Sequence, residues 1–156
     1  MSKAFEELDF QKTPLGDLIL RRRQVPSLGN REVYEVKLGE AFLMSSLFHE
    51  VEVALANLGL GELQSGLWDV VVGGLGLGYT LLHPRHGRFY SLDGLRRLAS
   101  HLLPGGVFAL WSDDPPEDEF LELLSGVFTK VKSEVVTFEN PLLERDSAST
   151  VYVASL

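Results

Sequence analysis

The stretch from Val70 to Thr80 most constrains the fold, because three consecutive valines run directly into a series of glycines. Three β-branched residues without polar alternation are typical of a central strand that is covered on both faces, as in a parallel sheet. Glycines at 74, 76 and 78 have no Cβ, so the backbone can turn sharply and approach a ligand closely. The pattern predicts a nucleotide-type loop at the carboxyl end of the first strand. A glycine-rich packing turn without a ligand is the alternative.

The charge of the chain limits the partners that it can bind. Its 156 residues carry a net charge of -8, whereas nucleic acids and anionic membranes are bound through clusters of Lys and Arg. We therefore expect neither nucleic acid nor membrane among its partners. The one basic run, Arg21-Arg22-Arg23, predicts a solvated strand edge that discourages pairing, with a phosphate or partner contact as the alternative.

The absence of cysteine excludes disulfides, thiolate metal sites and cysteine nucleophiles. Residues 1–30 contain acidic side chains and no apolar segment of a signal peptide, and no run is long enough to span a membrane. We therefore expect a cytoplasmic protein. A hydrophobic fraction of 45% is sufficient for a core.

The pattern divides the chain into an N-terminal β-hairpin section, residues 1–45, and an α/β section, residues 46–156. In the first section, turn residues separate three expected strands, at 18–20, 33–38 and 41–44. Three short strands bury too little surface to be stable alone. We therefore expect them to lie against the section that follows.

Three helices are expected after residue 45. Ser45-Ser46 predicts the cap of the first and Ser91 the cap of the second, because each precedes apolar residues at helical spacing. Asp114-Pro115-Pro116-Glu117 predicts the start of the third, with an acidic cap and prolines in the first turn.

Strands alternate with these helices. Residues 107–111 form a continuous apolar run, and residues 134–138 and 150–154 are two last strands that lie too close in sequence for a helix between them. That last pair is expected to be antiparallel. The order of elements otherwise predicts a mostly parallel α/β sheet of about four core strands.

In this order the residues resemble the class I S-adenosylmethionine-dependent methyltransferases, and among them the spermidine synthase-like branch. The glycine loop resembles their first motif, and Leu102-Leu103-Pro104-Gly105-Gly106 resembles the segment before their fifth strand. Phe48-His49-Glu50 and the β section before it are similar to the Tyr-His-Glu segment and the N-terminal domain of aminopropyltransferases. The resemblance implies a shortened Rossmann-like methyltransferase sheet, preceded by a small N-terminal β section.

The resemblance also implies a cofactor and a substrate site. The cofactor would be S-adenosylmethionine or decarboxylated S-adenosylmethionine, held by Gly73, Gly74, Gly76, Gly78 and Tyr79. His49 and Glu50 match a segment that lines the substrate pocket of the family, although a helix face turned toward solvent explains them equally well. Asp113 follows the 107–111 strand and is expected to border the substrate on the same side.

Two departures from the family bear on activity. Gly76 stands where aminopropyltransferases carry an aspartate, and only residues 81–90 separate the glycine loop from the next helix, so strands two to four of the family are missing. The missing part includes the acid that serves as base, so the catalytic residues are unknown. Asp93 has the spacing of a ribose-binding acid, but its place in the first turn of a helix favours a capping role.

No metal site is expected. His83 and His86 are separated by Pro84, and no nearby acid completes a zinc site, so a loop is favoured there. Acidic residues between Asp113 and Glu119 could hold a divalent cation, but stabilisation of a helix N-terminus explains them without a ligand.

The expected function is methyl or aminopropyl transfer to a small-molecule substrate, impaired by the missing strands. The alternative is a non-catalytic remnant or deletion variant that acts as a folded, dimeric scaffold. Loss of the middle strands would expose an apolar edge of the first strand, and such an edge invites pairing with another chain. A homodimer is therefore expected.

Overall fold

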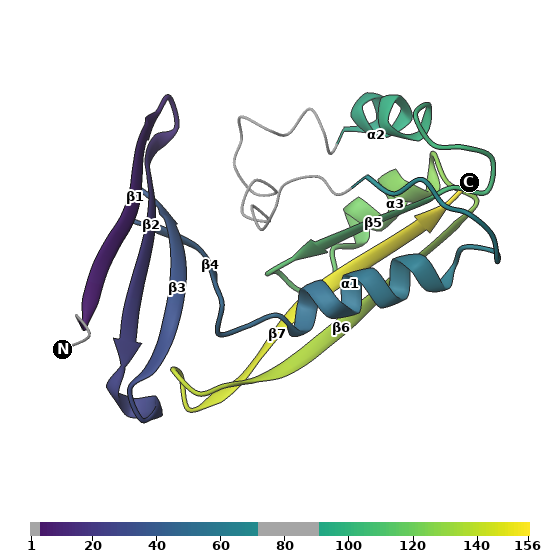
Figure 1. Ribbon diagram of the computed structural model, residues 1–156. Coiled ribbons are helices and arrows are strands. Elements are labelled where there is room, and N and C mark those ends of the chain that lie inside the picture. The colour runs from purple at the N-terminus through teal and green to yellow at the C-terminus, as the bar shows by residue number, and fades with distance from the viewer. Residues whose placement is uncertain (1–3, 72–90) are drawn as a thin grey trace.

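The computed structural model describes residues 4–71 and 91–156, and these form two separate antiparallel sheets (Figure 1). The first sheet has four strands in chain order, with the short 3-10 helix η1 (Pro26–Leu28) between its second and third strands. Its strands are β1 (Phe5–Thr13), β2 (Gly16–Val25), β3 (Arg31–Leu38) and β4 (Ala41–Ser45). The sequence indicated three of them. It did not single out β1 because that strand is almost wholly exposed and has no apolar run.

The second sheet has three strands in the order β5-β7-β6, and both pairs in it are antiparallel. Its strands are β5 (Val107–Ser112), β6 (Lys130–Asn140) and β7 (Arg145–Ser155). The helices are α1 (Glu50–Gly61), α2 (Leu92–Ala99) and α3 (Asp118–Ser125). None of the helices in the described ranges is long and apolar enough to cross a membrane.

Helices cover both faces of the β5-β7-β6 sheet. On one face, Val151 and Val153 of β7 pack with Val51 and neighbouring apolar residues of α1. On the other face, Tyr152 and Ala154 pack with apolar residues of α2 and α3. Successive residues of β7 thus pack against helices on opposite faces of the sheet, because side chains alternate along a strand.

The predicted shortened Rossmann-like α/β sheet is wrong, because all strand pairs in the described residues are antiparallel. Val70 and Val71, expected to begin the central parallel strand, are irregular and exposed. β7 takes the central place instead, since its hairpin partner β6 lies on one side and β5 on the other. The antiparallel pairing of the last two strands is confirmed, over a longer range than expected.

The three predicted helix starts agree with the structure to different degrees. Ser91 caps α2 as expected, because its Oγ accepts a hydrogen bond from the Gly94 N–H at 3.2 Å. Ser45 instead ends β4, and its Oγ accepts from the Leu47 N–H, so α1 begins only after His49. The two prolines of residues 114–117 precede α3, which begins at Asp118 without a side-chain cap.

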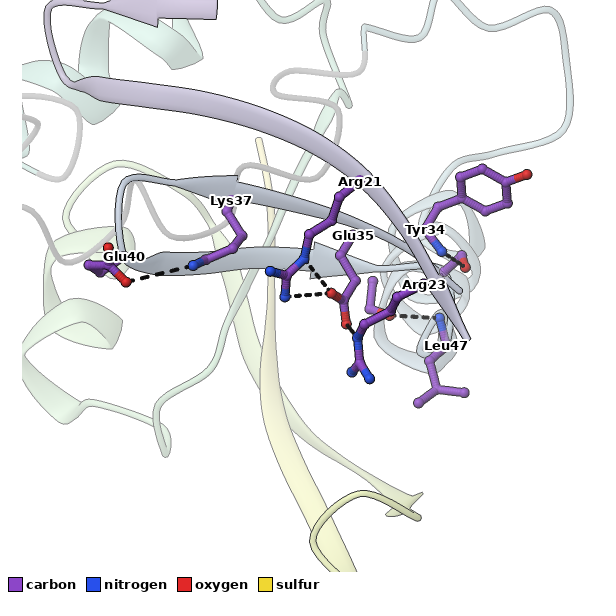
Figure 2. A network of polar contacts seen from close by, with 9 residues as sticks. Arg21, Arg23, Tyr34, Glu35, Lys37, Glu40 and Leu47 are labelled. Carbon is purple, nitrogen blue, oxygen red and sulfur yellow. Dashed lines mark hydrogen bonds and ion pairs between the residues drawn. The ribbon is translucent and has the colours of Figure 1, made fainter. Parts of the chain in front are cut away.

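The basic run does not form a strand edge, because β2 pairs with β1 on one side and β3 on the other. Arg21 and Arg23 share one face, and both donate to the Glu35 carboxylate with nitrogen–oxygen distances of 2.7 Å (Figure 2). Glu35 is only 1% exposed, so two cations neutralise a buried acid. Arg22 instead pairs with Glu6 and Glu32.

Gly59 lets α1 approach the sheet closely. A Cβ at this position would lie 3.0 Å from the Cβ of Ala109 on β5, whereas a Cβ at Gly61, two residues later in the same helix, would meet no atom within 4 Å. We expect Gly59→Leu to lower the free energy of unfolding by about 1–3 kcal/mol through overpacking. Gly61→Leu should change it by less than about 1 kcal/mol, since leucine also favours helix. Urea unfolding of both variants tests this, and equal losses would contradict it.

Candidate functional site

A cavity of about 360 Å³ lies where the two sheets approach each other. β4, the start of α1 and the end of β5 contribute residues to its lining. The distal part of the β6–β7 hairpin, which reaches toward the first sheet in Figure 1, contributes further lining residues. The site is therefore assembled from both sheets, and neither sheet forms it alone.

Aromatic side chains give the cavity apolar walls. Phe42 comes from β4, Trp111 from β5, Phe138 from β6, and Phe48 from the segment before α1. The rings of Phe48 and Phe138 are in contact, with centroids 5.7 Å apart and planes inclined by 52°. This contact joins the segment before α1 to the hairpin and fixes one boundary of the cavity.

The charged groups that line the cavity are acidic. Asp113 and Glu52 are its two carboxylates, and no Lys, Arg or His is among the described residues that line it. The Ser149 hydroxyl donates to Asp113 Oδ1 at 3.3 Å, which orients the carboxylate from the β7 side. The cavity therefore combines aromatic surface with negative charge, a combination suited to a small organic cation.

The predicted site residues are only partly brought together. Asp113 lines the cavity, and its expected place beside a substrate stays a prediction. His49 and Glu50 are exposed at the start of α1 and are not among the lining residues, so their substrate role stays a prediction. Gly73, Gly74, Gly76, Gly78 and Tyr79, together with His83 and His86, lie outside the described residues.

His49 and Glu50 instead interact with each other. The His49 N–H donates to the Glu50 carboxylate at 2.9 Å, and this bond, followed by that from the N–H of Glu50 itself, lowers the pKa of Glu50. The carboxylate thus lies where the first turn of α1 presents unpaired N–H groups. Local stabilisation of the helix accounts for this arrangement.

The acidic segment after β5 is anchored to β7. Thr150 Oγ1 donates to the Asp114 carbonyl at 2.6 Å, and the Glu117 N–H donates to the Tyr152 hydroxyl at 2.9 Å. Burial raises the pKa of Tyr152; the Glu117 hydrogen bond opposes this rise, and the charges of Glu117 and Asp114 add to it. Among the described residues, no three His, Asp or Glu side chains converge as a metal site.

The aromatic walls of the cavity are not evident from the sequence. Phe42 and Trp111 were interpreted only as strand residues, and Phe138 was counted only in the last hairpin. Each lies within three residues of a strand end, where side chains leave the core and border a surface hollow. Their position near a strand end was the signal available in the sequence.

Comparisons with protein-family models, curated proteins and solved structures found no match for this chain.

Proposed function

We propose that this chain is a spermidine synthase-like protein that binds a small organic amine in the cavity between the two sheets. The amine would bind in its protonated, positively charged form. The observation that carries the proposal is the lining, in which two carboxylates accompany four aromatic rings and no cationic side chain occurs among the described lining residues. An ammonium group gains about 0.5–2 kcal/mol from an aromatic face, and more from a carboxylate that accepts its hydrogen bond.

The cavity also fits such a ligand in size. About 360 Å³ is at the lower end of the range for small-molecule sites. A flexible diamine or triamine can place its methylene groups against Phe48 and Trp111 while an ammonium group approaches Asp113. Neutral diols of equal length share the methylene contacts but lack the charge, so they provide a direct comparison.

Methyl or aminopropyl transfer is the second half of the proposal, and it rests on the resemblance of residues 73–79 to a cofactor loop. Asp93, the residue at the spacing of a ribose-binding acid, is 92% exposed on α2 and lies 3.9 Å from the Arg96 guanidinium. We therefore assign no transfer step to the described side chains.

The experiment is isothermal titration of putrescine and spermidine into the purified chain, with 1,4-butanediol as the neutral control. We expect the amines to bind and the diol to give no heat. Asp113→Asn should weaken amine binding about 10- to 100-fold, because a charge-assisted hydrogen bond contributes about 1.5–3 kcal/mol. Asp146→Asn is the matched control, since Asp146 is an exposed aspartate outside the cavity.

If Asp113→Asn bound putrescine as tightly as the unchanged chain does, the proposed amine site would be wrong. Titration of S-adenosylmethionine, its decarboxylated form and methylthioadenosine tests the transfer half separately. Amine binding without any response to these three compounds would leave an amine-binding protein without transferase activity.

A non-catalytic, dimeric scaffold is the second candidate function. It is supported by the uncharged outer edge of β5, which offers a place for another copy of the chain. Both candidates place the protein in the cytoplasm and give it no nucleic-acid partner. Amine binding and dimerisation are compatible, because the cavity is lined by side chains whereas the edge of β5 pairs through its backbone.

A further inference from the structure

Three cationic side chains share one face of the first sheet. Arg21 and Arg23 are two residues apart on β2, so they lie on the same face, and the strand register places Lys37 of β3 diagonally beside Arg21. We call these three residues the basic cluster. Glu35, the residue of β3 opposite Arg21, is the buried acid of this face. Three cations beside one buried carboxylate leave two positive charges, in a chain whose net charge is -8.

The basic cluster holds more positive charge than Glu35 needs. One guanidinium neutralises one carboxylate, yet two of them donate to Glu35. Lys37 lies 3.8 Å from Glu40, whose carboxylate is fully exposed, so water screens this pair. Glu7, opposite Arg21 on β1, is also exposed and forms no ion pair with the residues that the structure describes. Since apolar residues can replace a buried ion pair without loss of stability, stabilisation does not account for this excess.

The arginines are held in place with hydrogen-bond donors to spare. Arg21 contacts Glu35 Oε2 through Nε and Nη2, and Arg23 contacts Oε1 through Nε, all at 2.7 Å. Figure 2 shows the two terminal nitrogens of Arg23 on the side away from Glu35. The side chains of Arg21, Arg23 and Lys37 are 24%, 28% and 19% exposed, so a solute can reach them. A fork of two N–H groups that is already fixed suits the oxygens of a phosphate or a carboxylate.

We propose that the basic cluster binds the phosphate dianion of a small solute, either free phosphate or a phosphate monoester. A dianion matches the two positive charges that remain once Glu35 is counted, whereas a carboxylate would leave one of them unmatched. The net charge of -8 repels long polyanions, which favours a small ligand. The basic run was the sequence feature for which a phosphate contact stood as an alternative, and the amine cavity does not use it.

Titration of inorganic phosphate into the unmodified chain tests the proposal, with the arginine Nε–H signals followed by NMR. We expect the signals of Arg21 and Arg23 to shift and to saturate. Acetate should bind at least about tenfold more weakly, because it carries half the charge. Methyl phosphate distinguishes the two sources of the dianion. Tighter binding than inorganic phosphate assigns a monoester as the ligand, and equal or weaker binding assigns the free ion.

Two variants locate the site without removing the partner of Glu35. Arg23→Lys keeps a cation beside this carboxylate but removes the planar fork. Lys37→Gln removes a charge that no buried group requires. Each should weaken phosphate binding about tenfold, and melting curves verify that the chain still folds. Arg22→Lys is the matched control, since Arg22 belongs to the same run but lies on the opposite face of the sheet, and its affinity for phosphate should not change.

Three results would overturn the proposal. The first is the absence of phosphate binding up to about 10 mM, a concentration above the range of specific small-molecule sites. The second is an unchanged affinity in both Arg23→Lys and Lys37→Gln, which would place the bound ion elsewhere. The third is acetate that binds as tightly as phosphate. Asp113→Asn should bind phosphate as the unmodified chain does, so failure of the phosphate site is distinguishable from failure of the amine site.

Discussion

Replacing Glu35 with alanine is expected to lower the free energy of unfolding by about 3 kcal/mol, because Arg21 and Arg23 then lose the buried carboxylate that neutralises both. The side chain of Glu35 is 1% exposed, whereas those of the two arginines are 24% and 28% exposed. Water can therefore solvate the arginines in part, which keeps the loss at the lower end of the range for broken buried ion pairs. Urea unfolding followed by circular dichroism measures the change.

Glu32→Ala is the matched control on the same strand. The Glu32 carboxylate is 41% exposed and lies 3.4 Å from Arg22, so its removal should cost less than about 1 kcal/mol. Replacing Glu35 together with both arginines by apolar residues should recover much of the stability, since no unpaired charge remains buried. A Glu35→Ala loss no larger than that of Glu32→Ala would contradict the assigned role of this carboxylate.

Leu124→Ala should have a comparable effect on the other side of the molecule. Leu124 lies on α3 with no exposed surface and packs with Leu95, Phe120 and Tyr152. Removing its side chain leaves a cavity in the layer beneath α2 and α3, at a cost of about 3 kcal/mol. For a chain of this size the Tm should fall by roughly 6–12 °C, as scanning calorimetry can measure.

The control for Leu124 is the same substitution at Leu143, which is 53% exposed in the turn of the β6–β7 hairpin. Leu143→Ala should change the free energy of unfolding by no more than about 0.5 kcal/mol. If Leu124→Ala also fell within this limit, the layer formed by α2 and α3 would not be packed as described.

Sequence patterns predicted local structure better than they predicted pairing. The Ser91 cap and the final hairpin were predicted because each depends on neighbouring residues. The continuous apolar run at 107–111 correctly indicated a strand, and the structure adds that helices cover both of its faces. Coverage, however, does not determine strand direction: helices on both faces accompany an antiparallel sheet here, because a long hairpin places β7 in the centre.

The candidate site shows the same difference between local patterns, which could be predicted, and contacts between distant segments, which could not. Asp113 could be singled out from its place after a strand, since strand ends are where side chains border clefts. The aromatic walls could not be predicted, because Phe42 and Phe138 are 96 positions apart in sequence and meet the same cavity only through the approach of two sheets. The basic run was likewise misinterpreted, because the partner of Arg21 and Arg23 is Glu35 on the next strand.

Both sheets line the cavity, so a molecule bound there would stabilise the folded form of the whole chain. A molecule that binds only when β4 and the hairpin are in place favours the folded state by mass action. At one hundred times its Kd, such a ligand adds about 2.7 kcal/mol, nearly the loss expected for Leu124→Ala. Amine supply would then set how much of a weakened chain remains folded, as melting curves with and without putrescine can show.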